Sequence, residues 1–289
     1  MPSISALFTY PIKSCGGIAL SRAQLLSTGL EYDRNWMVVN AAGNMFTQRT
    51  HAQLARVKTA FDTGHLVIRA PDMPELRTPL SAAALADAEP LAATVWRDTV
   101  GALDCGAQAA SWFSEFLGEP ARLARFAPAA RRAVSSKWTG SVASHTQFAD
   151  GFPLLVIGQS SLDDLNARLR AKGAPAIPID RFRPNLVLDT LDAYEEDYVE
   201  ELTCRADAHE VLIRLVKLCT RCPVPNIDQQ TGAPDPAWPH EPTDTMSGYR
   251  GSPQFDGALT FGKNGIVVRG EGAHLEVGQT VGAELGFGD

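Results

Sequence analysis

Short apolar runs separated by polar turns fill the first third of the chain and predict strands rather than helices. Ile4–Tyr10 is apolar and rich in residues that favour strands, and Ala19–Leu26 is a second strand candidate. Trp36–Thr47 and Val57–Ile68 each place a Gly-containing turn between two apolar runs, which predicts two hairpins. The stretch 71–90 is rich in Ala and Pro without clear periodicity, so we expect a loop.

Two segments carry apolar residues at helical spacing. Gln108–Leu117 gathers aromatic residues on one face and is followed by Gly118, which is typical of a helix end. A leucine stripe predicts a second helix after the buried strand Leu154–Ile157. We expect Ser160 or Ser161 to cap this helix.

The last third returns to strands around one long loop. Asn185–Leu188 and Val211–Leu218 predict strands, and a loop then runs to about Gly251. A loop of that length is typical of functional segments, so we expect it to border a substrate pocket. Ala258–Arg269 predicts a hairpin that turns at 262–265. Many short strands with two helices favour an α+β, mainly β, barrel-like architecture over a parallel doubly wound sheet.

Composition narrows the class of protein. The 289 residues are 45% hydrophobic and 20% charged, as in ordinary globular proteins, and the formal net charge is −7. This charge argues against a nucleic-acid partner. A basic cluster over 122–137 is either a solvated face or a surface for an acidic protein. Without a signal peptide, a membrane-spanning run or a disulfide pattern among five cysteines, we expect a soluble cytoplasmic protein.

The most informative motif is Cys219-Thr220-Arg221-Cys222, directly after a predicted strand. A redox dithiol would open a helix, but Pro223 and further loop residues follow. A structural zinc site would need about four ligands, and no second paired motif exists. Two incidental cysteines and one thiolate on an open metal site both remain compatible with the spacing.

Three further segments offer groups that suit an anionic ligand. Arg183-Pro184-Asn185 combines a rigid fork of donors with an amide that can pair with a heterocycle. Lys13-Ser14, followed by Gly16 and Gly17, suggests an anion nest. Arg34 follows Asp33 just before an apolar strand. Each alone is equally compatible with a turn, a surface side chain or an ordinary ion pair.

The usual catalytic signatures are missing. The sequence has neither Gly-x-Ser-x-Gly nor His-Glu-x-x-His, and its cysteines lack the clustering of an iron–sulfur protein. We therefore expect no iron–sulfur cluster in this chain. If the protein is an enzyme, a bound cofactor carries the difficult chemistry.

Taken in order, these motifs resemble the MOSC superfamily, in the branch with an N-terminal MOSC β-barrel-like region that includes the mitochondrial amidoxime-reducing components and bacterial reductases of N-hydroxylated compounds. The segments that carry the resemblance extend over nearly the whole chain: Tyr10–Gly17, Asp33–Val38, Asp150–Leu154, Ser161–Asn166, Phe182–Asn185, Cys219–Cys222 and Tyr249–Phe255. The resemblance implies a MOSC β-barrel with a β-rich MOSC_N region and a few helices. It suggests a MOSC_N domain over 1–125 and a MOSC domain over 126–289.

The resemblance also implies a molybdenum–molybdopterin cofactor. Cys222 matches the metal ligand and is the implied catalytic residue. The implied cofactor contacts are Lys13, Ser14, Arg34, Asp150, Gly151, Phe152, Arg183, Asn185, Thr220 and Arg221. Asp228, just beyond the ligand, is a candidate for shaping the loop or relaying protons, although an Asx-type turn is the simpler interpretation.

The implied activity is reduction of small N-hydroxylated substrates from N–OH to N–H. The alternative is a non-catalytic module that carries the cofactor or its sulfur. The first motif begins at Tyr10, so we expect no targeting peptide or membrane anchor. The chain ends at Asp289 without the ferredoxin domain of some bacterial relatives. Electrons are then expected from a separate ferredoxin-, cytochrome- or flavoprotein-type donor.

Overall fold

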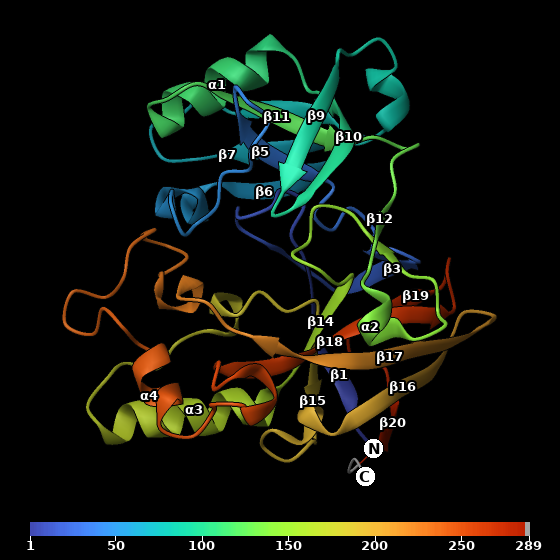
Figure 1. The fold of residues 1–289 in the computed structure, drawn as a ribbon, viewed down its shortest axis with the longest axis vertical. Coiled ribbons are helices and arrows are strands. Elements are labelled where there is room, and N and C mark those ends of the chain that lie inside the picture. Colours follow the sequence, from blue (N-terminus) through green and yellow to red (C-terminus); the bar gives the residue numbers. More distant parts are fainter. Residues whose placement is uncertain (287–289) are drawn as a thin grey trace.

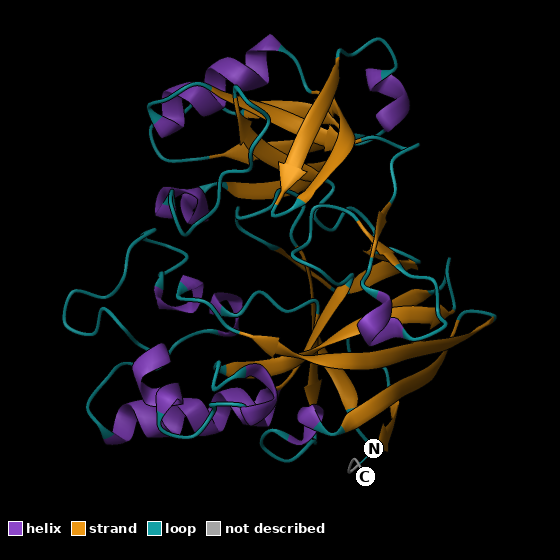
Figure 2. Cartoon of the chain, in the orientation of Figure 1, coloured by secondary structure: helices purple, strands orange, loops and turns teal. Residues whose placement is uncertain are grey.

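The computed structural model describes residues 1–286 and shows two lobes, one above the other (Figure 1). Strands dominate both lobes (Figure 2), which confirms the α+β, mainly β prediction. The upper lobe contains one four-stranded and one three-stranded sheet. Its elements are β5 (Trp36–Asn40), β6 (Lys58–Asp62), β7 (His65–Arg69), β8 (Leu76–Pro79), β9 (Pro90–Val95), β10 (Asp98–Asp104), α1 (Ala107–Leu117) and β11 (Ala121–Phe126).

The lower lobe is built on an eight-stranded half-barrel sheet that draws its strands from both ends of the chain. The strand order is β2 (Ile18–Leu20), β1 (Ser3–Thr9), β15 (Leu186–Asp189), β14 (Leu154–Gly158), β18 (Thr260–Arg269), β17 (His209–Thr220), β16 (Val199–Ala206) and β20 (Gly282–Leu285). Only the β14–β15 pair is parallel among these pairings. The division of the chain at residue 125 stays a prediction.

Shorter elements complete both lobes and the connection between them. The small strands are β3 (Arg22–Leu26), β4 (Gly29–Leu30), β12 (Arg132–Ala133), β13 (His145–Thr146) and β19 (His274–Glu276). The lower helices are α2 (Ser136–Thr139), α3 (Gln159–Ala171) and α4 (Thr243–Ser247). The 3-10 turns are η1 (Ala52–Arg56), η2 (Ala82–Leu85), η3 (Ile179–Arg181), η4 (Glu195–Asp197), η5 (Val224–Asn226) and η6 (Pro253–Phe255).

Each lobe buries apolar side chains on two sides of its main sheet. In the lower lobe one cluster fills one side of the half-barrel, with Leu7, Val156 and Ile213 among its members. The other side of β14 packs Ile157 against the leucine stripe of α3. These strands are therefore fixed on both faces, and their ends provide rigid positions for the loops that follow.

The two predicted helices are present, but the predicted cap of the second is wrong. α3 begins directly after β14, and its N-cap is Gly158, without a side-chain hydrogen bond. Ser160 Oγ donates to the Leu191 carbonyl, and Ser161 Oγ donates to Glu196 Oε2. Both hydroxyls serve contacts with the segment after β15, and the backbone enters the helix straight from the strand.

The predicted hairpin at 258–269 is also wrong. β18 continues from Thr260 to Arg269, and the Gly-Lys-Asn-Gly stretch lies inside it as an irregular strand. Gly262 has φ of +73°, and a Cβ there would approach Ile157 Cγ1 to 2.6 Å. Gly262 thus allows close packing within the strand. Because glycine is also common in turns, the sequence alone could not distinguish the two cases.

The predicted loop at 71–90 contains β8 and η2, so it is more ordered than expected. The long loop after β17 also differs from its expected place. Of residues 223–251, only Val224 lines the main pocket. Trp238 and Met246 instead pack into the apolar cluster around α3, and Lys172 pairs with Glu241. Burial of apolar side chains has drawn most of this loop away from the pocket.

Candidate functional site

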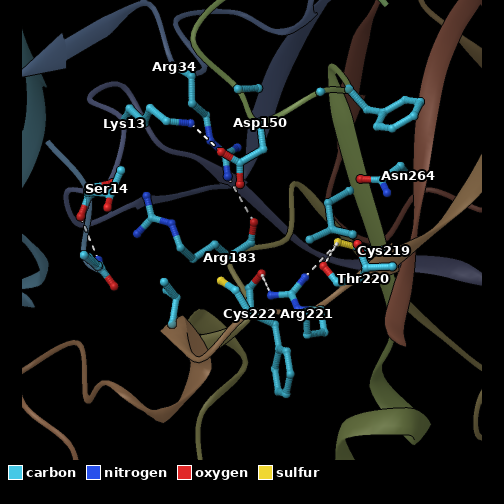
Figure 3. A pocket seen from close by; sticks show the side chains of 18 of the residues that line it. Lys13, Ser14, Arg34, Asp150, Arg183, Cys219, Thr220, Arg221, Cys222 and Asn264 are labelled. Atoms are coloured by element: carbon cyan, nitrogen blue, oxygen red, sulfur yellow. Dashed lines mark hydrogen bonds and ion pairs between the residues drawn. The ribbon is translucent and has the colours of Figure 1, made fainter. Parts of the chain in front are cut away.

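One pocket between the lobes is lined by all eleven residues that the family resemblance implied, and Figure 3 labels most of them. The space between its walls, counted out to open solvent, is about 940 Å3, and the pocket is open on one side. Upper-lobe segments add Thr47, Gln48, Arg49 and Trp96 to its lining. The predicted residues are Lys13, Ser14, Arg34, Asp150, Gly151, Phe152, Arg183, Asn185, Thr220, Arg221 and Cys222.

The end of β17 delivers the sulfur-bearing wall of the pocket. The strand ends at Thr220, and the Arg221 amide bonds to the Leu259 carbonyl at 2.7 Å. The Arg221 guanidinium donates to Cys219 Sγ at 3.0 Å and to the Phe182 carbonyl at 2.8 Å. The two cysteines therefore differ: Cys219 is engaged by Arg221, whereas Cys222 lies beside the pocket without a hydrogen bond among the described residues (Figure 3).

The opposite wall stacks two arginines on one buried tyrosine. The guanidinium carbons of Arg34 and Arg183 lie 4.3 and 4.4 Å from the Tyr10 ring centroid. Burial raises the pKa of Tyr10, although both arginines oppose the shift, so the ring remains a neutral platform. Both arginines have positive φ, +49° and +58°, so sharp local turns aim them at the ring.

The two arginines differ in their partners. Arg34 Nη1 donates to both carboxylate oxygens of Asp33, at 2.7 and 2.6 Å, and Nη2 donates to the Arg183 carbonyl. Arg183 has no ion pair among residues 1–286, and its buried Nη2 lacks any hydrogen-bond partner. Burial, and then the charge of Arg34, lowers the pKa of Arg183. A guanidinium whose Nη2 is buried and unpaired is ready for an anion.

Lys13 forms a separate, neutralised corner of the pocket. Its buried Nζ donates to the Phe148 carbonyl at 2.9 Å and to Asp150 Oδ1 at 2.5 Å. Burial lowers the pKa of Lys13 and by itself would raise that of Asp150, but the charge and hydrogen bond of Lys13 hold the pKa of Asp150 well below its usual range. Trp96 Nε1 also donates to this carboxylate, at 3.1 Å.

Arg132, which the sequence placed in a basic cluster, holds the Asp150 turn from behind. It is buried and donates to the carbonyls of Gln147, Ala149 and Asp150 and to the carboxylate of Asp98. Arg125 of the same cluster is buried as well. The solvated-face interpretation is therefore wrong for these two side chains, which sequence spacing alone could not distinguish from exposed arginines.

The anion nest expected from Ser14, Gly16 and Gly17 is not formed as predicted, because only Ser14 lines the pocket. Ser14 lines the pocket with φ of +68°, and Gln48 Nε2 donates to its carbonyl at 2.7 Å. Gly16 and Gly17 do not line the pocket; the Gly16 amide bonds to the Val57 carbonyl. A Cβ on Gly17 would lie 2.5 Å from Tyr10, so that glycine makes room for the stacked ring.

Asn185 and Asp228 have mainly structural hydrogen bonds. The buried Asn185 amide accepts from Leu155 N and donates to the Phe8 carbonyl, which joins neighbouring strands beneath the pocket. Asp228 Oδ1 accepts the amides of Gln230 and Thr231, which confirms the Asx-type turn. Its other oxygen accepts from Arg181, which fixes the loop after Cys222.

The pocket is cationic although the chain is acidic. Lys13, Arg34, Arg49, Arg183 and Arg221 line it, against a single carboxylate, Asp150. Among residues 1–286, no three His, Cys, Asp or Glu side chains are grouped as a metal site made of protein alone. A metal here would need ligands from a cofactor in addition to a cysteine. No helix in the described part of the chain has the length and hydropathy to cross a membrane.

Comparison with known proteins identifies the family. The MOSC N-terminal beta barrel domain matches residues 1–120, and the MOSC domain matches residues 143–281. Mitochondrial amidoxime reducing component 2 of Bos taurus is 33% identical over 86% of this chain and 72% of its own length. Component 1 of Homo sapiens is 31% identical over 86% and 72%, respectively.

A third relative has a different name. Molybdenum cofactor sulfurase of Oryza sativa subsp. japonica is 30% identical over 96% of this chain, but the match covers 35% of that protein. The chain therefore belongs to the MOSC family and is homologous to the amidoxime-reducing components.

Proposed function

We propose that the pocket binds a molybdenum–molybdopterin cofactor through Cys222 and reduces N-hydroxylated compounds. The homologous amidoxime-reducing components support this reaction class. The cofactor, when bound, supplies the redox chemistry: two electrons and two protons convert an N–OH group into N–H and water. Every other part of the proposal concerns what this chain's own residues contribute.

Arg183 carries the proposal. It presents a buried Nη2 without a partner in the same pocket as Cys222, so a cation that needs an anion lies near a sulfur that suits a soft metal. A metal-bearing cofactor with an anionic tail satisfies both groups at once. Either feature alone would fit many ligands, but their combination is restrictive.

The proposed cofactor contacts lie on two sides of the pocket, one cationic and one bearing the sulfur atoms. Arg183, Arg34, Lys13 and Ser14 would hold the pterin and its phosphate on the cationic side. Gly151 and Phe152 would contribute the turn beside Asp150, with Asn185 supporting the strands beneath. Thr220 and Arg221 flank the sulfur, and Arg221 fixes the turn by bridging Cys219 Sγ and the Phe182 carbonyl.

We further propose that the electrons come from a separate donor protein. The pocket opens to solvent at the junction of the lobes, where Arg49 and Trp96 are exposed. An N-hydroxylated substrate would enter by the same opening. The physiological donor and substrate are then determined by this rim rather than by the buried cofactor contacts.

Activity measurements on two cysteine variants test the proposal. The protein is produced in a host that makes the cofactor and is assayed with an amidoxime and an artificial electron donor. Cys222→Ser should reduce turnover by more than the roughly 10–100-fold typical of losing an outer-shell partner of a metal. Cys219→Ser, the matched control, should remain within about tenfold of wild type.

Other outcomes would contradict parts of the proposal. Equal loss in both variants would favour a dithiol mechanism. Cofactor retained without any turnover would favour the carrier function. A wild-type protein that retains no pterin would remove the proposed function altogether.

A further inference from the structure

A second pocket lies between the lobes and has no part in the proposed function. It is lined by segments 125–132 and 145–147, by Ala82 of η2, and by Ser27 and Thr28 after β3. Its cavity volume is about 410 Å3. We call it the interlobe pocket, because Ala82 belongs to the upper lobe and the Ser27–Thr28 turn to the lower lobe.

The lining of the interlobe pocket is cationic. Arg125, Arg131, Arg132 and His145 contribute to it, and no Asp or Glu does. Arg132 is paired with Asp98. Arg125 and Arg131 have no carboxylate within ion-pair distance among residues 1–286, in a chain whose formal net charge is −7. A local excess of positive charge in an acidic protein attracts anions to this place.

Arg125 makes the pocket more than a basic surface. The residue is 7% exposed, and its guanidinium lies 4.0 Å from the Trp36 ring centroid. Its Nη atoms donate only to neutral groups, Asn35 Oδ1 and the Leu80 carbonyl. Its buried Nε has no hydrogen-bond partner. A buried positive charge with neutral partners and a free donor is costly unless an anion joins it.

Two neighbouring side chains show the same incomplete hydrogen bonding. Thr146 Oγ1 and Gln147 Oε1 are buried without partners, and both residues line the interlobe pocket. The hydroxyl can donate to an oxyanion, while the amide oxygen can accept from a protonated ligand oxygen or a bridging water. The unpartnered atoms of Arg125, Thr146 and Gln147 thus belong to residues of a single pocket.

We propose that the interlobe pocket binds a small oxyanion, a phosphate or carboxylate group, between Arg125 and Arg131. This site is separate from the proposed cofactor site. Arg132 links the two, because it lines the interlobe pocket and donates to the Asp150 carbonyl behind the main pocket. An experiment must therefore separate binding at Arg125 from binding at Arg183.

The test uses the full-length chain with Arg183→Gln as the background, which removes the buried unpartnered Nη2 donor of the main pocket. Inorganic phosphate and acetate are titrated separately. Binding is followed by calorimetry and by the Nε–Hε resonance of Arg125 in nitrogen-labelled protein. We expect saturable binding that shifts this resonance; tighter binding of phosphate or of acetate then tells which oxyanion the pocket favours.

A second substitution makes the assignment specific. Arg131→Gln added to the background should weaken binding roughly tenfold or more, because a charged hydrogen bond is lost. Arg170→Gln removes the same charge from an exposed position in α3, outside both pockets, and should leave the affinity unchanged. An Arg125 resonance that does not respond to either anion would overturn the proposal, as would equal weakening by both substitutions.

Discussion

Arg183 in the main pocket and Glu196 behind α3 each have a buried polar atom without a hydrogen-bond partner and no ion pair among the described residues, yet they differ in how the charge is handled. Glu196 is fully buried, one oxygen accepts from Ser161, and the other has no partner. Burial raises the pKa of Glu196 to about 7, so the group is readily neutralised by a proton.

Arginine has no such escape, because its guanidinium remains protonated throughout the physiological range. The charge of Arg183 therefore persists until an anion meets it. This contrast shows why an unpaired buried arginine is a stronger sign of a ligand than an unpaired buried carboxyl group. The same reasoning applies to Arg125 in the interlobe pocket.

The largest expected effect is the change in stability with pH that burial of Glu196 causes. The folded state holds a proton on Glu196 up to about pH 7, whereas an ordinary glutamate releases it near 4.3. The folded state thus binds more protons across this window, and stability falls as pH rises through it. At pH 8, Glu196→Gln should raise the free energy of unfolding by about 3 kcal/mol relative to wild type.

Urea unfolding of wild type and Glu196→Gln at pH 5 and pH 8 measures this effect. The gain should be much smaller at pH 5, where the wild-type carboxyl is already largely protonated. Glu115→Gln, at an exposed position in α1, provides the control and should show little difference between the two pH values. If the effect of Glu196→Gln on stability were the same at pH 5 and pH 8, Glu196 would not be neutralised by a proton, and its contrast with Arg183 would be lost.

A somewhat smaller effect is expected from substitution of Arg183, the second member of the comparison. Arg183→Gln should weaken cofactor retention by roughly 10–100-fold, because hydrogen bonds to charged groups contribute about 1.5–3 kcal/mol. The same change should leave the cofactor-free protein as stable as wild type or more so, since it removes an unpaired buried charge. Pterin content after dialysis and thermal unfolding of the cofactor-free protein give the two readouts.

Arg183→Lys separates charge from geometry in this experiment. Lysine keeps the positive charge but lacks the planar fork, so partial retention of the cofactor is expected. A cofactor-free Arg183→Gln protein that loses stability would contradict the account, because Arg183 would then have a structural rather than a ligand-binding role.

The smallest effect concerns the Lys13–Asp150 corner, where the charges already have partners. The Asp150 side chain is 72% exposed to the pocket, so Asp150→Asn should cost less than about 1 kcal/mol at pH 7. The lowered pKa of Asp150 means that its contribution is present above the ordinary value, near 3.9, and is lost as pH falls below it.

Urea unfolding at pH 7 and at pH 3 checks this expectation. The difference between wild type and Asp150→Asn should shrink at the lower pH. Asp87→Asn, an exposed aspartate without an ion pair in the described chain, should show no such change. A loss of several kcal/mol in Asp150→Asn would mean that Lys13 depends on this carboxylate as a buried structural pair.

The sequence predicted elements well where burial produced a simple pattern. The apolar runs at β1, β14 and β15 and the aromatic face of α1 mark segments buried in the lobes. β16, with the sequence Val-Glu-Glu-Leu-Thr-Cys-Arg-Ala, and β10, which begins and ends with Asp, were not predicted, because exposed polar positions hide their alternation. Gly262 misled for a different reason: glycine serves close packing as readily as a turn.

The eleven residues that the family resemblance implied line one pocket, and the strand predicted before Cys219 leads into its sulfur-bearing wall. Their role in binding a cofactor stays a prediction, and their pairing could not be predicted. Which arginine lacks a partner depends on contacts between segments far apart in the chain, such as Lys13 with Asp150 across 137 positions. Single-sequence patterns contain no information about such contacts, nor about the positive φ values that aim Arg34 and Arg183.

The most direct test of the central claim is the molybdenum and pterin content of the purified chain from a cofactor-producing host. The account predicts molybdenum and pterin in equal amounts in wild type and in Cys219→Ser, and a large loss of both in Cys222→Ser. Undiminished molybdenum in Cys222→Ser, or wild-type protein without molybdenum and pterin, would contradict it.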